Sequence, residues 1–164
     1  MEDEIVIRQA VLADWEETMD MTWETFLKFE AEDYGAEGVE NFKKFISDPV
    51  LKRMFLLGMY HMYVAVHKDK IVGMVSLRDK SHVSLLFVKA DYHRKGIGKR
   101  LIETIGAFAK EEYDKNELTV NAAPYGLAFY KSIGFRSVSP MTCSGGIKYI
   151  GMKKEIGEYD GKVV

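Results

Sequence analysis

The sequence predicts an α/β fold, with a mixed, mostly antiparallel central sheet of about seven strands and helices on both faces. Two observations support this prediction. Between residues 60 and 89, runs typical of strands follow one another without a helical pattern between them, so neighbouring strands should pair antiparallel. After residue 96, a helical pattern leads from this meander to a further strand, and a crossover of that kind predicts a parallel pair.

Length and composition are those of one globular domain. The chain has 164 residues, of which 47% are hydrophobic and 29% charged. We place the domain at residues 1–156 and expect 157–164 to be a frayed tail. The acidic N-terminus lacks a signal-like apolar segment, and the longest apolar run, 54–66, is too short for a bilayer. We therefore expect a cytoplasmic protein without a membrane partner.

The first part of the chain is expected to form a short strand and then helices. The predicted elements are a strand at 5–7 and helices at 13–29, 39–48 and 49–57. Apolar residues recur at helical spacing in these segments, and Asp14 can cap the first helix. The segment 34–38 should break the helical pattern. Pro49 should end the second helix because proline disfavours helical geometry in the residue before it.

The remainder alternates strands with two helices. The predicted elements are strands at 60–67, 71–78 and 81–89, a helix from the glycine loop to about 113, a strand at 118–121, a helix at 125–133, and strands at 135–138 and 147–154. Asp69 and Lys70 supply the first turn, and Gly134 suits the end of the last helix. The final two strands should form a hairpin around a loop at 139–146.

The segment His93–Gly98 is the strongest candidate for a binding site. Gly96 and Gly98 lie where a strand gives way to a helix, and glycine lets successive main-chain N–H groups turn towards one anion. The helix adds the positive end of its dipole and its unpaired N–H groups. Cationic side chains crowd the same turn: Arg94, Lys95, Lys99 and Arg100. The simplest ligand is a phosphate or pyrophosphate.

Other interpretations of this glycine loop fit less well or stay open. A Rossmann dinucleotide site requires a third small residue, where this chain has Leu101, and the P-loop motif is absent. A helix that uses glycines only to turn, with its basic residues in solvent, remains an alternative. The basic cluster is local and lacks interleaved aromatic residues, which disfavours nucleic acid as a partner.

Charge is distributed unevenly along the chain. Residues 14–40 contain ten acids and one base, a balance of −9, whereas the whole chain has a net charge of −2, so the remainder carries +7. One pole would then attract an anionic cofactor and the other a cationic amine. Alternatively, most of these acids form the solvated faces of two helices.

Two ordered motifs resemble those of the GNAT superfamily of acyl-CoA N-acetyltransferases. Gly96 and Gly98 match its pyrophosphate loop, (Q/R)-x-x-G-x-(G/A), with His93 where Gln or Arg is usual. Residues 121–135 look like its second signature, which ends in Y-x-x-x-G-F. The resemblance spans roughly residues 4–155 and implies acetyl-CoA as cofactor. The residues that it implies for cofactor binding are Leu86, Phe87, Val88, His93, Arg94, Lys95, Gly96, Ile97, Gly98, Lys99, Asn121 and Tyr130.

Tyr130 is the candidate general acid. By resemblance, it matches the tyrosine that hydrogen-bonds the cofactor sulfur and protonates the leaving thiolate. A phenol can donate a proton at neutral pH, as this role requires. The alternative is an aromatic side chain that packs the helix against the sheet, a role that fits the neighbouring Phe129 better.

The strand at 81–89 carries the candidate base. Its period of two predicts His82, Ser84 and Leu86 on one face and Val83, Leu85 and Phe87 on the other. By resemblance, His82 and Ser84 would lie near the acceptor, with His82 as base and Ser84 as a residue that relays a proton or orients water. The alternative is a strand-end histidine capped by Arg78 or Asp79. Glu32, Asp33 and Glu37 are alternative bases, from the helices that by resemblance cover the acceptor pocket. Tyr34 and Arg78 are further candidates for that pocket.

The resulting expectation is an N-acetyltransferase that moves an acetyl group from acetyl-CoA to a primary amine by direct attack in a ternary complex. The acceptor is expected to be a small cationic amine, with polyamine, aminoglycoside and basic peptide all open. The competing interpretation is an acyl-CoA-binding sensor without turnover. No metal is expected, and the resemblance allows a homodimer.

Overall fold

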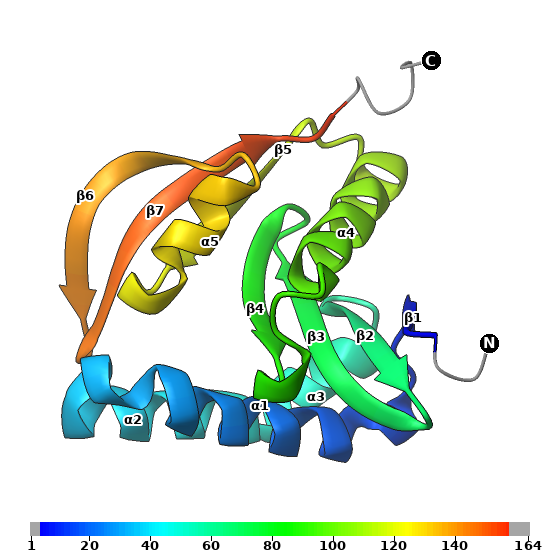
Figure 1. The fold of residues 1–164 in the computed structure, drawn as a ribbon, viewed down its shortest axis with the longest axis horizontal. Helices are drawn as coiled ribbons and strands as arrows, with labels where there is room; N and C mark the ends of the chain where they lie inside the picture. The colour runs from blue at the N-terminus through cyan, green and yellow to red at the C-terminus, as the bar shows by residue number, and fades with distance from the viewer. Residues whose placement is uncertain (1–3, 158–164) are drawn as a thin grey trace.

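A computed structural model describes residues 4–157 as one seven-stranded sheet with helices on both faces (Figure 1). The strand order is β1-β2-β3-β4-β5-β7-β6, and every neighbouring pair is antiparallel except β4 with β5. The strands are β1 Val6–Gln9, β2 His61–His67, β3 Lys70–Arg78, β4 His82–Val88, β5 Glu117–Ala122, β6 Arg136–Ser144 and β7 Ile147–Glu155. The predicted fold class is therefore confirmed. Apart from Gly157, the tail expected to be frayed lies outside the described residues.

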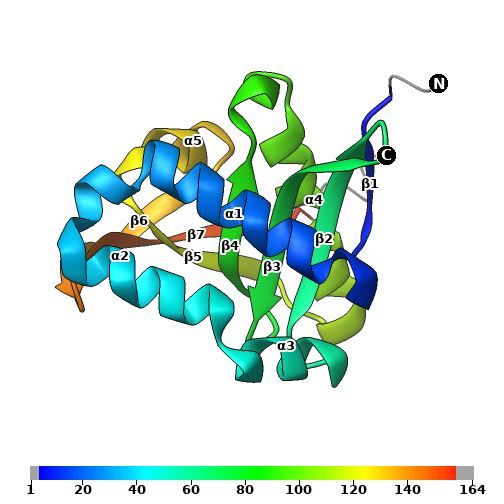
Figure 2. The ribbon, with the colours of Figure 1, turned by 90° about the horizontal axis from the view of Figure 1, so that it is seen from below.

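Helices cover the sheet in two layers (Figure 2). Those on one face are α1 Trp15–Phe29, α2 Ala31–Ser47 and α3 Pro49–Leu56, and those on the other are α4 Ile97–Tyr113 and α5 Leu127–Ser132. Short 3-10 turns occupy Leu12–Asp14, Ala90–Tyr92 and Pro124–Gly126. Among the described residues, no helix combines the length and apolar character needed to cross a membrane.

Each helical layer has its own core because its helices carry one apolar stripe. Beneath α1 and α2, Phe26 stacks on Phe42 with ring centroids 4.0 Å apart and meets Tyr34 edge-on at 4.9 Å. On the opposite face, Leu101 and Ile105 of α4 are fully buried against the sheet. Burial of such side chains stabilises the fold by about 1.5–3 kcal/mol each.

The boundary between α1 and α2 differs from the prediction. The second helix begins at Ala31 rather than at residue 39, and the predicted break remains only as a kink at Gly35, where φ is +71°. The two helices therefore meet at Glu30. Asp14 does not cap α1 as expected, because its carboxylate is used by Arg8, at 2.8 Å, and by the N–H of Val11, at 2.7 Å.

The last hairpin is tighter than predicted. Instead of a loop at 139–146, β6 continues to Ser144 and turns at Gly145 and Gly146, which have φ of +59° and +81°. The turn lies directly against α2, where a Cβ atom on Gly38 would come within 2.6 Å of the carbonyl oxygen of Gly146. Asn41 also donates a hydrogen bond to the carbonyl of Gly145. The predicted loop was too long because two adjacent glycines are enough to connect the two strands.

A bulge in β4 changes which side chains share a face. The register with β3 pairs Ser76 with Leu85 and Leu77 with Val83, so Ser84 is the extra residue. Val83 then faces the α4 core, whereas Leu85 and Phe87 face the α1 and α2 core. The uninterrupted alternation predicted for this strand is therefore wrong beyond Ser84.

The pairing of β4 with β5 is short. Only His82 with Thr119 and Val83 with Val120 are paired, and beyond them the strands part. In Figure 1 the rest of β4 stands apart from β5 and β7, and α5 lies over β5 and β7.

We predict that Gly38→Ala lowers the free energy of unfolding by about 1–3 kcal/mol, because the added methyl group must push the hairpin turn away from α2. Urea unfolding monitored by circular dichroism measures this change. Glu40→Ala, at an exposed site on the same helix, is the control and should change stability by less than about 0.5 kcal/mol. Equal stability of Gly38→Ala and wild type would contradict the contact.

Candidate active site

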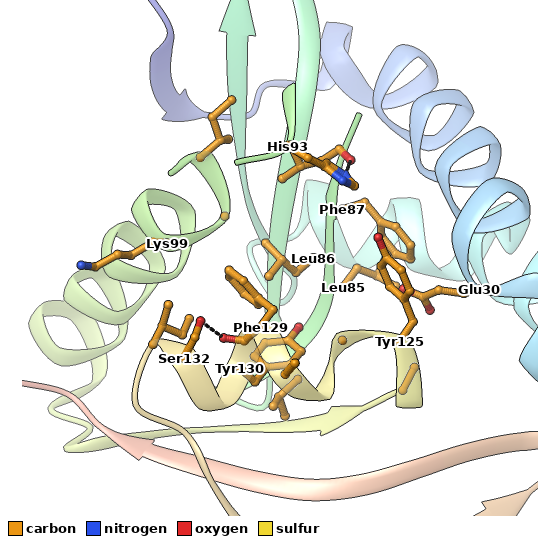
Figure 3. A pocket seen from close by; sticks show the side chains of 18 of the residues that line it. Glu30, Leu85, Leu86, Phe87, His93, Lys99, Tyr125, Phe129, Tyr130 and Ser132 are labelled. Atoms are coloured by element: carbon orange, nitrogen blue, oxygen red, sulfur yellow. Dashed lines mark hydrogen bonds between the residues drawn. The ribbon is translucent and has the colours of Figure 1, made fainter. Parts of the chain in front are cut away.

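A cavity of about 810 Å³ opens where β4 and β5 part. Its walls come from the α1–α2 junction, the second half of β4, the start of α4, the end of β5, and α5 (Figure 3). The sequence-predicted residues that line it are Tyr34, Ser84, Leu86, Phe87, Val88, His93, Arg94, Gly96, Ile97, Gly98, Lys99, Asn121 and Tyr130. Those that do not line it are Glu32, Asp33, Glu37, Arg78, His82 and Lys95.

The glycine loop forms one end of the cavity. Arg94 and Gly96 have φ of +63° and +78°, and Gly96 begins α4 without a side-chain cap. The first intrahelical bond of α4 runs from the N–H of Arg100 to the carbonyl of Gly96. The preceding N–H groups of the helix therefore have no intrahelical acceptor. Such a loop and helix start can bind an anion through the main chain.

Cationic side chains contribute unequally at this end. Arg94 lines the cavity, whereas Lys95 is exposed outside it. Lys99 lines the rim, but its side chain points away from the cavity in Figure 3. The main chain of the loop is thus better placed than most of its basic side chains to contact a bound anion.

Gly98 is needed for packing rather than for its backbone angle. A Cβ atom there would lie 2.9 Å from Cζ of Phe129. The absence of a side chain lets the first turn of α4 approach α5 closely. Phe129 in turn lies edge-on to Tyr130, with ring centroids 5.3 Å apart, so the glycine loop and Tyr130 are joined by direct packing.

His93 is held in place by its neighbours. Its Nε2 lies 2.7 Å from the carbonyl oxygen of Val88 and donates to it, since a carbonyl can only accept. Its ring lies 4.8 Å from that of Phe29, which stacks on Tyr125 at 5.2 Å. These rings join the α1 end, the glycine loop and the segment before α5 along one wall of the cavity.

Tyr130 is buried, and its hydroxyl has no hydrogen-bond partner among the described residues. Burial, reinforced by the charge of Glu30, raises its pKa above the usual value. The phenol therefore remains protonated at neutral pH and can donate into the cavity.

Ser84 lines the cavity, and its hydroxyl is hydrogen-bonded to the buried pair formed by Tyr60 and Ser76. The hydroxyl of Tyr60 lies 2.7 Å from Oγ of Ser76 and donates to Oγ of Ser84 at 3.1 Å. The bulge places Leu85 and Phe87 on the same side of β4 as Ser84. This strand therefore presents both polar and apolar side chains towards α1 and α2.

His82 lies outside the cavity lining, where β4 and β5 are still paired. Its Nδ1 is 2.8 Å from Oγ1 of Thr119. Burial, followed by the nearby Arg78, lowers the pKa of His82 to about 4. The imidazole is therefore neutral at pH 7 but only weakly basic.

Glu30 is a cavity residue that sequence reasoning missed. It projects from the α1–α2 junction, and the hydroxyl of Tyr34 donates to its Oε1 at 3.4 Å. Burial raises the pKa of this carboxyl to about 7, and the charge of Asp33 adds to the effect. A sequence signal did exist, because Glu30 continues the buried stripe of α1 through Met19, Thr22 and Phe26, where an acid is unusual.

The described residues contain no cluster of three or more His, Cys, Asp or Glu side chains able to hold a metal. The cavity offers main-chain N–H groups at one end, a phenol in the middle, and a carboxyl of raised pKa at the other end (Figure 3).

Comparison with known proteins gives a family match. The model of the acetyltransferase (GNAT) domain matches residues 30–156. A GCN5-related N-acetyltransferase structure from Rhodopseudomonas palustris is 22% identical, with a TM-score of 0.78, over 92% of this chain and 94% of that one. PaiA N-acetyltransferase from Thermoplasma acidophilum, solved with coenzyme A, is 20% identical, with a TM-score of 0.77, over 93% and 99%. An aminoglycoside 6′-N-acetyltransferase complexed with coenzyme A is 13% identical, with a TM-score of 0.63, over 93% and 97%.

The raised pKa of Glu30 predicts a pH-dependent contribution to stability. In the folded chain this pKa is about 7, compared with an ordinary value of 4.5. The resulting stabilisation is complete below the unfolded pKa and is lost as the pH rises through 7. We predict that Glu30→Gln removes this part of the fall in the free energy of unfolding between pH 4.5 and 7.

Urea unfolding at a series of pH values, with wild type and variant in parallel, measures that difference. Glu24→Gln, at an exposed position of α1, is the control and should keep the wild-type slope. Identical slopes for Glu30→Gln and wild type would mean that Glu30 titrates like a solvent-exposed glutamate.

Proposed function

The chain belongs to the GNAT family of acetyltransferases, and on that premise we propose that it transfers an acetyl group from acetyl-CoA to a primary amine by direct attack in a ternary complex. One observation supports the proposal above all: a single cavity runs from the uncapped start of α4 to the hydroxyl of Tyr130. Release of free thiol from acetyl-CoA in the presence of a panel of primary amines tests it. Saturable, amine-dependent release is expected, and its absence with every amine would contradict the proposal.

The glycine loop would bind the diphosphate of coenzyme A. Positive φ at Arg94 and Gly96 turns the main chain, and the N–H groups at the start of α4 have no intrahelical acceptor. Both the family's use of acetyl-CoA and the shape of this end of the cavity support this assignment of the diphosphate site. When bound, acetyl-CoA supplies a thioester as the acyl donor. The side chain of His93 is engaged with Val88, so its part would be to shape the loop.

The second half of β4 would guide the rest of the cofactor. Leu86, Phe87 and Val88 line the cavity after the pairing with β5 has ended. Their main-chain groups on that side have no strand partner. Apart from the carbonyl of Val88, which accepts a hydrogen bond from His93, these groups are available to amides of a ligand. Asn121 lines the opposite wall on β5.

Tyr130 would act as the general acid. Its hydroxyl opens into the cavity and remains protonated at neutral pH. It can hydrogen-bond the sulfur and deliver a proton as the carbon–sulfur bond breaks. Tyr130 also packs against Phe129 and Phe135, which would hold the phenol in a fixed orientation.

We predict that Gly96→Val reduces affinity for coenzyme A at least about tenfold, because valine is strained at positive φ and would turn the N–H groups away. Isothermal titration calorimetry measures the affinity. Gly58→Val is a matched control, since Gly58 also has open space and a φ of +76° but lies outside the cavity. If both folded variants bind coenzyme A like wild type, the loop is not the diphosphate site.

We predict that Tyr130→Phe lowers kcat at least about tenfold with little change in affinity for coenzyme A, because only the proton donor is lost. Steady-state kinetics and calorimetry provide the two values. Tyr63→Phe, which lies outside this cavity, is the control and should keep wild-type turnover. Equal loss of turnover and of cofactor affinity would instead indicate a packing role for Tyr130.

A further inference from the structure

Glu30 is the only carboxylate that lines the cavity within residues 4–157. The cationic residues of the lining, Arg94 and Lys99, belong to the opposite end, at the start of α4. No ion-pair partner for Glu30 is found in that same part of the chain. A carboxylate held in a cavity without a cation is unfavourable unless a ligand supplies one.

Tyrosines rather than bases surround this carboxyl. Tyr34 donates to it from α2. Burial first, and then the charge of Glu30, raises the pKa values of Tyr125, before α5, and of Tyr130, in α5. Asp33 faces it from the exposed side of α2 and favours its protonated form. In Figure 3, Glu30 enters the cavity from the helix junction and lies beside Tyr125, while Tyr130 reaches the cavity from α5.

The other candidates for a base are less suitable. His82 lies outside the cavity and, with a pKa of about 4, is a poor proton acceptor at neutral pH. Glu32 and Glu37 are exposed and do not line the cavity. The carboxyl of Glu30, with a pKa of about 7, is matched to neutral pH, which is where a general base is most effective.

We propose that Glu30 binds the ammonium group of the acceptor and takes its proton, and that the acceptor is a monoamine with an apolar or aromatic stem. This inference rests on the proposed acetyl transfer and adds a base and a substrate class to it.

The proton balance closes as follows. Glu30 takes one proton from the ammonium group, and the free amine forms a bond to the acetyl carbon. The carbon–sulfur bond breaks, and the thiolate receives a proton from Tyr130. The new amide nitrogen loses its second proton, which restores Tyr130 directly or through water. Glu30 finally releases its proton to solvent, so the reaction yields the amide, the free thiol and one proton.

The walls around Glu30 define the substrate class. Aromatic side chains line this end of the cavity, namely Tyr34, Phe42, Phe87 and Tyr125. Such faces attract one ammonium group and the apolar carbon next to it. A polyamine would place further charges against these walls without a second carboxylate among the described lining residues. The exposed acids of α1 and α2 are therefore not the feature that selects the acceptor.

The pH dependence of kcat/KM tests the role of Glu30, with phenethylamine as the probe acceptor. Wild type should show a rising limb with a midpoint near pH 7. Glu30→Gln should lose this limb and at least about 100-fold of kcat/KM at neutral pH, with unchanged affinity for coenzyme A. Glu24→Gln, exposed on α1, is the matched control and should retain both the limb and the activity.

A rising limb near pH 7 that persists in a folded Glu30→Gln variant would overturn the proposal while leaving acetyl transfer intact. Absence of turnover in wild type with every amine would instead contradict the proposed function itself. Tyr34→Phe provides a second measurement. It removes a hydrogen bond that stabilises the charged carboxylate, so the limb should move to higher pH, and an unmoved limb would count against Glu30 as its origin.

Comparison of phenethylamine with spermidine tests the substrate class. We expect kcat/KM for phenethylamine to exceed that for spermidine at least about tenfold, since stacking and burial favour the aromatic stem. A preference for spermidine would overturn the assignment of a monoamine acceptor.

Discussion

The early end of the pairing between β4 and β5 is the constraint on which the site depends. A central strand normally pairs along its length on both sides, but here only His82 and Val83 pair with β5. Beyond them β5 continues beside β7, and the main chain of β4 faces a cavity instead of a strand. Unpaired main-chain groups in such a place need water or a ligand. The sheet is therefore incomplete where a ligand can complete it.

The bulge at Ser84 determines what β4 presents at this opening. It reverses the alternation, so that Leu85 and Phe87 reach the α1 and α2 core while Leu86 and Val88 face the α4 side. The bulge itself is held by Tyr60, whose hydroxyl donates a hydrogen bond to Oγ of Ser84. The strand can thus hold two layers together and still leave its edge free.

The cavity is polarised along its length. Main-chain N–H groups and Arg94 lie at the α4 end, and Glu30 lies at the α1–α2 junction, with Tyr130 from a third wall. An anionic cofactor and a cationic acceptor would enter such a cavity from different ends and meet near the phenol. This arrangement would keep two ligands of opposite charge at separate ends of the cavity.

The sequence predicted the sheet class and the strand, loop and helix around Gly96 because each depends on local patterns, whereas Tyr130 was singled out by the resemblance to a known family. Gly96 and the following apolar spacing indicate a strand, loop and helix whatever the rest of the chain does. The bulge was missed because it depends on the register with β3, and the hairpin because its two adjacent glycines were placed inside a longer loop. The stripe of α1 marks Glu30 as an unusual acid, but that it lines a cavity follows from how β4, β5 and α5 are arranged around the helix junction.

A crystal structure of the chain with coenzyme A tests the central claim most directly. If the opening between β4 and β5 is the cofactor site, the diphosphate oxygens will lie within hydrogen-bonding distance of main-chain N–H groups of residues 94–98, and the thiol will lie beside the hydroxyl of Tyr130. A diphosphate bound elsewhere, with this opening filled only by water, would contradict the claim.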